Sequence, residues 1–147
     1  MAFLNAMNIS ASGLTAQRAR LDVISENISN SNITRTESGD PYRRRMVVFE
    51  PRTQGSFQEI FNKTAFGGAS TQRGVIVSEI VEDESPFKSV YDPTHPDADE
   101  DGYVMMPNVD LLKETIDSME ASRAYDANVT AFNAIKAMAT KGLEVGR

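Results

Sequence analysis

Apolar residues near the start of the chain recur at the spacing of one helix face. The positions, each three, four or seven residues after the one before, are Leu4, Met7, Ala11, Leu14, Leu21, Ile24 and Ile28. Repeats of this kind are typical of a helix that packs lengthwise against another helix. They predict a helix from Leu4 to Ser29, about 39 Å long at about 1.5 Å per residue.

Beyond this helix the pattern changes to short runs of β-branched and aromatic residues. The segment NSNITRTESGDPYRRR is rich in residues that favour turns. The runs MVVFE, GVIVSEIV and FKSVY follow, and Gly and Pro residues separate them, as they separate strands. Residues 42–106 are therefore predicted to form a small, mainly antiparallel β region with long loops.

Helical spacing returns near the end of the chain. Asn108 is a good helix N-cap, Asp110 would lie in the first turn, and neither Pro nor Gly occurs from there to Gly142. The predicted helix from Asn108 to Leu143 is about 50 Å long at about 1.5 Å per residue. Globular helices average only about 11 to 12 residues, so this length favours a coiled coil.

Together these elements predict an α+β protein. We expect long N- and C-terminal helices to pair as an antiparallel coiled-coil-like hairpin, with a small, mainly antiparallel β region inserted between them. Three segments follow: an N-terminal helix (residues 1–33), an extended turn and β region (34–106) and a C-terminal helix (107–147). The first and third segments would form one discontinuous helical domain.

The two predicted helices have few large apolar side chains for their length. Two isolated helices cannot bury such residues completely, and the alanine-rich steps ASRAYDA and AIKAMAT allow close approach on more than one side. We therefore expect the terminal helices to need neighbouring subunits. A monomeric α+β domain, with its helical hairpin packed on the β region, is the alternative that periodicity alone leaves open.

Composition and charge narrow the classes of function. The 147 residues are enough for one domain, include no Cys and carry a formal net charge of −6. The charge argues against a nucleic-acid partner, and the lack of Cys excludes disulfides and thiolate chemistry. The start MAFLNAMNIS lacks the features of a secretory signal, and no apolar run is long enough to span a bilayer. Work outside the cytoplasm would need another export route.

Two sequence features resemble parts of a metal-binding or catalytic site, but each lacks residues that such a site requires. Asp97, Asp99 and Asp101 match the first half of an EF-hand calcium loop, but Asn108 stands where a bidentate Glu is needed. The sole histidine, His95, has neither a second metal-ligating His nor a recognisable nucleophile. A calcium-binding module and a hydrolase using His95 remain alternative hypotheses. No cofactor and no catalytic residue is predicted.

The dense basic cluster YRRR is the remaining charged feature. Arg43, Arg44 and Arg45 run directly into MVVFE, so we expect them on a strand. A nucleic-acid site would need a longer basic stripe with interleaved aromatic residues. We predict a candidate inter-subunit charge patch, and an ordinary exposed strand face is the alternative.

The stretch ASGLTAQRARLDVISENISNSN resembles the N-terminal signature of the bacterial flagellar rod and hook axial proteins. The matching residues are Ser12, Gly13, Leu14, Ala16, Gln17, Arg20, Leu21, Asp22, Asn27, Ile28, Asn30 and Asn32. TRTESGDPYRRRMVVFE, and the segments from VSEIVEDESPFKSVYDPTHP to the end of the chain, are similar to proximal-rod members of that family. The resemblance covers nearly the whole chain, apart from the less characteristic residues 52–72.

The resemblance implies a non-enzymatic structural subunit of the proximal rod of the flagellar basal body. Such subunits polymerise helically into a torque-transmitting drive shaft around the export channel. Expected partners are other rod proteins, further copies in the helical array, a membrane-ring adaptor at the rod base and the flagellar type III export apparatus. Neither nucleic acid nor direct membrane insertion is expected.

The resemblance also implies a cellular location and an export route for the chain. We expect a periplasmic rod protein that is exported without a cleaved signal peptide. Phe3 and Met7 form a candidate export element, for which an ordinary helix start is the alternative. The predicted subunit-packing residues are Leu14, Arg20, Leu21, Ile24, Asn27, Ile28, Met119, Tyr125, Val129, Phe132, Ile135 and Met138.

Overall fold

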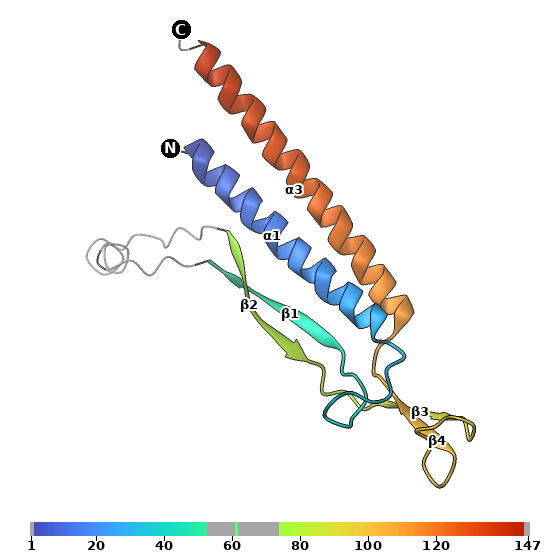
Figure 1. The fold of residues 1–147 in the computed structure, drawn as a ribbon. Coiled ribbons are helices and arrows are strands. Elements are labelled where there is room, and N and C mark those ends of the chain that lie inside the picture. The colour runs from blue at the N-terminus through green and yellow to red at the C-terminus, as the bar shows by residue number, and fades with distance from the viewer. Residues whose placement is uncertain (1, 53–60, 62–73, 146–147) are drawn as a thin grey trace.

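A computed structural model describes residues 2–52, 61 and 74–145 of the chain. Two long helices, α1 (Ala2–Ser29) and α3 (Leu111–Val145), lie side by side and run antiparallel (Figure 1). The start of α1 and the end of α3 lie toward the same end of this helical hairpin, and α3 extends past α1 (Figure 1). The predicted α+β fold with a hairpin of long terminal helices is confirmed.

Four strands lie between the helices in the sequence. β1 (Arg45–Pro51) pairs antiparallel with β2 (Val75–Glu82), and β3 (Lys88–Tyr91) pairs antiparallel with β4 (Tyr103–Met106). The β1–β2 pair runs along α1 on the side away from α3, whereas β3 and β4 lie beyond the far end of the helical hairpin (Figure 1). The predicted small antiparallel β region is thus two separate two-stranded sheets.

A glycine fits the start of β2 closely against α1. Gly74 has a φ of 89°, and a Cβ added there would overlap Ser12 Oγ. The same oxygen accepts a hydrogen bond from Val75 N at 3.1 Å and donates one to Ile9 O at 2.7 Å. Only glycine combines this left-handed backbone with so close an approach, so the position fixes where β2 meets α1.

The structure corrects the predicted start of the C-terminal helix. Asp110, not Asn108, is the N-cap: its Oδ1 accepts hydrogen bonds from two backbone N–H groups of the first turn, at 3.0 and 3.4 Å. Asn108 instead accepts a hydrogen bond from Arg44 N at 2.8 Å and donates one to Asp83 O at 3.0 Å. Because Asn108 links loops from other parts of the chain, the helix begins only at Leu111.

The core of the described residues is small and partly polar. Two of its most completely buried side chains, Asn27 and Glu114, are polar or charged. The buried apolar residues are Ala16, Val23, Ile24, Tyr42, Val104, Val109 and Ala121. Within the described residues, neither long helix carries an apolar stretch that would let it cross a membrane.

Candidate functional site

The contact between α1 and α3 is built largely from small side chains. Ala16 and Ala121 are 3% and 0% exposed. A Cβ added to Gly13 would lie 3.0 Å from side-chain atoms of Asn128. The two helices therefore approach closely at this point, and their contact buries little large apolar surface.

A buried polar cluster joins α1, α3 and the segment that leads into β1. Glu114 of α3 is 0% exposed, and its Oε1 accepts a hydrogen bond from Arg44 Nε at 2.6 Å. The other oxygen, Oε2, accepts a hydrogen bond from Asn27 Nδ2 of α1 at 3.1 Å. We call Asn27, Tyr42, Arg44 and Glu114 the junction cluster. Removing one member of a buried pair leaves an uncompensated charge, so this cluster holds the three elements in one arrangement.

Asn27 makes the bonds that attach α1 to β1. Its Nδ2 donates to Arg45 O at 2.9 Å, and its Oδ1 accepts from Arg45 N at the same distance. The Tyr42 hydroxyl also donates to Oδ1, at 3.0 Å. Burial raises the pKa of Tyr42 above its usual 10.0, so this hydroxyl keeps its proton through neutral pH. The Asn27 amide thus occupies the place of a neighbouring strand at the start of β1.

Two further carboxylates balance the charge of Arg44 at the edge of the junction cluster. Arg44 Nη2 lies 3.3 Å from Asp117 Oδ2, and Nη1 lies 3.7 Å from Asp83 Oδ2. Asp117 also lies 3.4 Å from Arg20 Nη2 of α1. Hydrogen bonds from the backbone and side chain of Ser85 hold the pKa of Asp83 below its usual 3.8, which favours the ionised form.

The structure gives the three arginines of the predicted inter-subunit charge patch, Arg43, Arg44 and Arg45, different surroundings within their own chain. Arg44 is only 9% exposed and already faces carboxylates of its own chain. Arg44 turns toward α3, whereas its half-buried neighbours Arg43 and Arg45 contact Phe87 and the Glu26 side chain of α1. Arg43 Cζ lies 4.4 Å above the ring of Phe87, and Arg45 Nη1 lies 2.7 Å from Glu26 Oε1.

The acidic segment 97–101 is arranged as a turn. Asp97 Oδ2 accepts a hydrogen bond from the Thr34 hydroxyl at 2.8 Å, and Asp97 N donates to His95 Nδ1 at 3.1 Å. Asp99 N donates to Tyr103 O at 2.9 Å. In the part of the chain that the structure describes, no group of three or more His, Asp and Glu side chains has the arrangement of a metal site.

The predicted subunit-packing residues differ in exposure. Ile24 and Asn27 are buried. The half-buried ones are Leu14, Arg20, Leu21, Tyr125, Val129, Phe132 and Ile135. The exposed ones are Ile28, Met119 and Met138. Of the candidate export element, Met7 is half-buried and the Phe3 side chain lies outside the described residues.

One face of α3 carries large apolar residues that its own chain leaves exposed. Leu112, Ile116 and Met119 are 72%, 46% and 50% exposed. Their spacing of four and three residues places them on one helix face, roughly opposite the face that carries the buried Glu114 and Ala121. We call these three residues the α3 back stripe. Sequence reasoning did not single out Leu112 for packing, although its spacing to Met119 carries the signal.

Two protein-family models match the ends of the chain. Residues 7–35 match the family described as "Flagella basal body rod protein". Residues 100–145 match the family described as "Flagellar basal body rod FlgEFG protein C-terminal". The matched ranges include most of α1 and all of α3, which are the two helices that the junction cluster joins.

Several similar full-length proteins share one name. The chain is 48% identical over 151 residues to the flagellar basal-body rod protein FlgC of Bacillus subtilis (strain 168), with 100% of both chains covered. It is 42% identical over 154 residues to FlgC of Borreliella burgdorferi, covering 99% of this chain and 98% of that one. It is also 42% identical over 147 residues to FlgC of Escherichia coli O157:H7, with 100% of both chains covered. The similarity therefore spans both helices and the β region between them.

Proposed function

The chain belongs to the family of flagellar basal-body rod proteins named FlgC, and we propose that it polymerises helically in the proximal part of the rod, around the export channel. Membership of this family makes it a structural subunit of the basal body and not an enzyme.

The observation that carries the proposal is the exposed α3 back stripe. Leu112, Ile116 and Met119 are all at least 46% exposed on one straight helix. Contiguous apolar surface of this kind marks a contact site with another protein. Burying each side chain fully would contribute about 1.5 to 3 kcal/mol. Exposed alanines continue the same helix face toward the C-terminal end, where they leave room for a neighbouring helix: Ala127, Ala134 and Ala137.

The proposed drive shaft needs subunits that do not bend internally. We assign residues 1–33 and 107–147 to one discontinuous helical domain, which packs against neighbouring copies and other rod proteins. The junction cluster supports this assignment because Asn27 and Glu114 fix the β1–β2 pair to both helices. Torque would then pass through many subunit contacts at once instead of deforming each subunit.

The route to the rod is part of the same proposal. The chain would be exported by the flagellar type III apparatus without cleavage, and Phe3 and Met7 would be read at the export gate. Both positions lie in the first two turns of α1. A membrane-ring adaptor at the rod base and the adjoining rod proteins would be its neighbours in the periplasm.

A double substitution in the α3 back stripe tests the proposal. Leu112→Glu with Met119→Glu would leave synthesis unchanged but prevent incorporation into isolated basal bodies and abolish swimming, because each carboxylate would be buried unpaired at a subunit contact. The matched control, Leu112→Met with Met119→Leu, keeps the surface apolar and is expected to swim. Normal incorporation of the Glu variant would contradict the proposal.

A further inference from the structure

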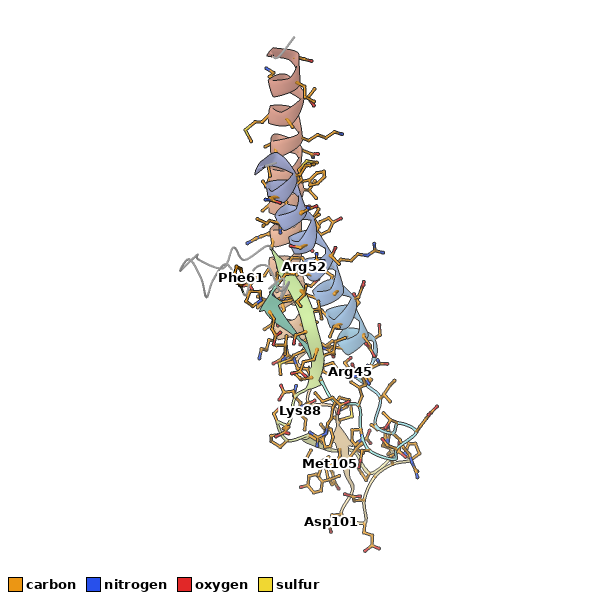
Figure 2. The ribbon with its side chains drawn as sticks, turned by 90° about the vertical axis from the view of Figure 1, so that its left-hand side faces the viewer. Arg45, Arg52, Phe61, Lys88, Asp101 and Met105 are labelled. Atoms are coloured by element: carbon orange, nitrogen blue, oxygen red, sulfur yellow. The ribbon has the colours of Figure 1, made fainter. Side chains whose placement is uncertain are left out.

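The β1–β2 pair is a two-stranded sheet, and α1 closes one corner of each of its two edges. At the start of β1, the backbone N–H and C=O of Arg45 both bond to the Asn27 amide, at 2.9 Å. At the start of β2, the backbone N–H of Val75 donates to Ser12 Oγ at 3.1 Å. Because the strands run antiparallel, these two corners lie diagonally opposite each other. The stretch from Arg45 to Arg52 therefore runs alongside α1 but is closed by it only at one end (Figure 2).

The rest of the β1 edge has backbone groups without partners. In an antiparallel pair, alternate residues direct their N–H and C=O groups away from the neighbouring strand. Arg44 O accepts a hydrogen bond from Asp83 N at 2.8 Å, on the side of β2, so the groups of Val47 and Phe49 point the other way. These outward groups make no hydrogen bond to any residue that the structure describes.

β2 has an open edge of the same kind. Ile80 pairs with Val47, and Val77 pairs with Phe49, so the backbone groups of Ile80 and Val77 also point outward. The Ile80 side chain is 54% exposed, and the nearby Glu82 is exposed as well. An open edge strand is a template for pairing with another chain.

A groove of about 270 Å³ lies beside the open edge of β1. β1 forms one of its sides, and residues of α1 and α3 form the other. Val23 and Ile24 of α1 and Phe49 of β1 supply its apolar lining. An apolar side chain from an added strand would be covered there, and an adjoining carboxylate would not be repelled. The charged lining residues are Arg20, Arg44 and Arg45 against Glu114 and Asp117.

We propose that β2 of a second copy of this chain adds to the open edge of β1, so that the two sheets continue into one. Val47 pairs with Glu82 of the second copy, and Phe49 pairs with its Ile80. This register is displaced by two residues from the one inside the chain, which keeps the added strand clear of Asn27. The inference rests on the proposed function, because it names one contact of the helical array.

The groove receives side chains of the added strand. Residues that pair across strands share one face of the sheet. Ile80 of the second copy therefore points into the groove that Phe49 lines, toward Val23 and Ile24. Glu82 of the second copy lies on the same face, near Arg20, whose side chain is 32% exposed.

The dimensions of the molecule agree with repetition of this contact. The β1–β2 pair, α1 and α3 form three successive layers, with one helix in each helical layer (Figure 1). Two strands span about 10 Å, and packed helices lie about 8 to 10 Å apart. Each further copy thus adds two strands and one helix per layer at matching spacing. The displaced register moves it about 7 Å along the strands, so the contact is heterologous and extends a helical array.

Cysteine cross-linking tests the contact inside intact rods, because the chain contains no Cys of its own. Val48→Cys and Val81→Cys are carried on separate chains that are expressed together, and isolated basal bodies are oxidised mildly. In the proposed register these positions form a non-hydrogen-bonded pair with Cα atoms about 4.5 Å apart, which a disulfide can bridge. A disulfide-linked dimer is expected only when both chains are present.

A matched control moves the second cysteine along β2. Val48→Cys with Val75→Cys uses the corner that Ser12 closes, about 20 Å farther along the strand, and is expected to give no dimer. Glu50→Cys with Glu79→Cys is the next facing pair, at two exposed positions. This pair is expected to give the dimer too, and it decides the test if a valine variant fails to enter the rod.

A lysine in the added strand tests how β2 fits the groove. Ile80→Lys on the Val81→Cys chain is expected to lower the yield of dimer about tenfold, because its ammonium group would lie near Arg20. The control Ile76→Lys replaces another exposed isoleucine of β2, close to the closed corner, and should leave the yield within about twofold. Urea unfolding of the dilute monomers should not distinguish the two variants. Equal yields of dimer from both would overturn the place given to Ile80.

The outcomes separate this inference from the proposed function. Chains that enter basal bodies but give no dimer from either facing pair of cysteines would overturn the strand contact and leave the rod role intact. A chemical cross-link from position 48 to a different rod protein, with no dimer of this chain, would overturn the second copy as occupant. The α3 back stripe lies on another face of the molecule, so its substitution bears on the proposed function alone.

Discussion

At the scale of single residues, Asn27 and Glu114 decide how the elements meet. Asn27 bonds to the backbone of Arg45, and Glu114 receives Arg44 and Asn27 without any exposure to solvent. A buried polar cluster fixes the relative orientation of the elements more strictly than an apolar contact does, because hydrogen bonds are directional. The chain therefore uses its buried polar residues to set the angle between the helices and the β1–β2 pair.

Removing the charge of Glu114 tests the junction cluster. Glu114→Gln is expected to lower the free energy of local opening by on the order of 3 kcal/mol, because Arg44 stays buried without its nearest carboxylate. Hydrogen exchange of the amides of β1 and the first turns of α3 measures the loss. Glu120→Gln, an exposed position on the same helix, serves as the control and should change the same amides by less than about 0.5 kcal/mol. Equal effects of the two substitutions would contradict the role of Glu114.

Tyr42 gives the junction cluster a dependence on alkaline pH. Its pKa in the folded chain is raised above 10.0 by burial, so its contribution is complete below that pH and is lost as the pH rises further. Tyr42→Phe lacks this titration and loses only the hydrogen bond to Asn27, worth about 1 kcal/mol. The stability gap between wild type and variant, measured by urea unfolding, should shrink between pH 9 and pH 11. A gap that stays constant over this range would refute the assignment.

The sequence identified some of these residues but not their partners. Asn27 stands within the signature that the chain shares with axial proteins, and Arg44 stands in the basic run. Glu114 pairs with Arg44 across 70 positions of sequence, and no local pattern carries such a pairing. The burial of Arg44 depends on the antiparallel register of the helices, which places Glu114 beside it, so it could not be predicted from the local sequence.

At the scale of elements, periodicity predicted the helices and strands well and their ends less well. The helix expected from Leu4 to Ser29 spans Ala2–Ser29, because its apolar spacing is unbroken. The C-terminal helix begins at Leu111 instead of Asn108, because both Asn108 and Asp110 have the chemistry of an N-cap. Tertiary hydrogen bonds to Arg44 and Asp83 decide between them.

Substitutions of the two glycines in the helices, Gly13 and Gly142, test how closely α1 and α3 approach each other. Gly13→Leu is expected to force the helices apart, because a Cβ there already lies 3.0 Å from Asn128. Nothing lies within 4 Å of a Cβ at Gly142, so Gly142→Leu gains helix propensity of roughly 0.7 kcal/mol without a clash. Helix content, measured by circular dichroism, and incorporation into basal bodies should therefore fall for Gly13→Leu and not for Gly142→Leu. Normal assembly of Gly13→Leu would mean that the close approach is dispensable.

At the scale of the whole molecule, the described residues form an elongated chain with more apolar surface than it covers. The α3 back stripe and the apolar side chains of Tyr91, Tyr103 and Met105 in the β3–β4 pair are exposed, and the contact between α1 and α3 relies on small residues. Sequence reasoning anticipated this shortage from the few large apolar residues. It could not place the exposed faces, because these depend on which side of α3 turns toward α1.

Hydrogen exchange along α1 and α3 tests the central claim, that the helical ends depend on neighbouring subunits. The full-length chain is compared as a dilute monomer and within isolated basal bodies. We predict fast exchange in the monomer from Leu4 to Ile9 and from Lys136 to Leu143, with protection appearing in the rod. The amides beside the junction cluster should be protected in both. Slow exchange along the whole of both helices in the dilute monomer would contradict the account.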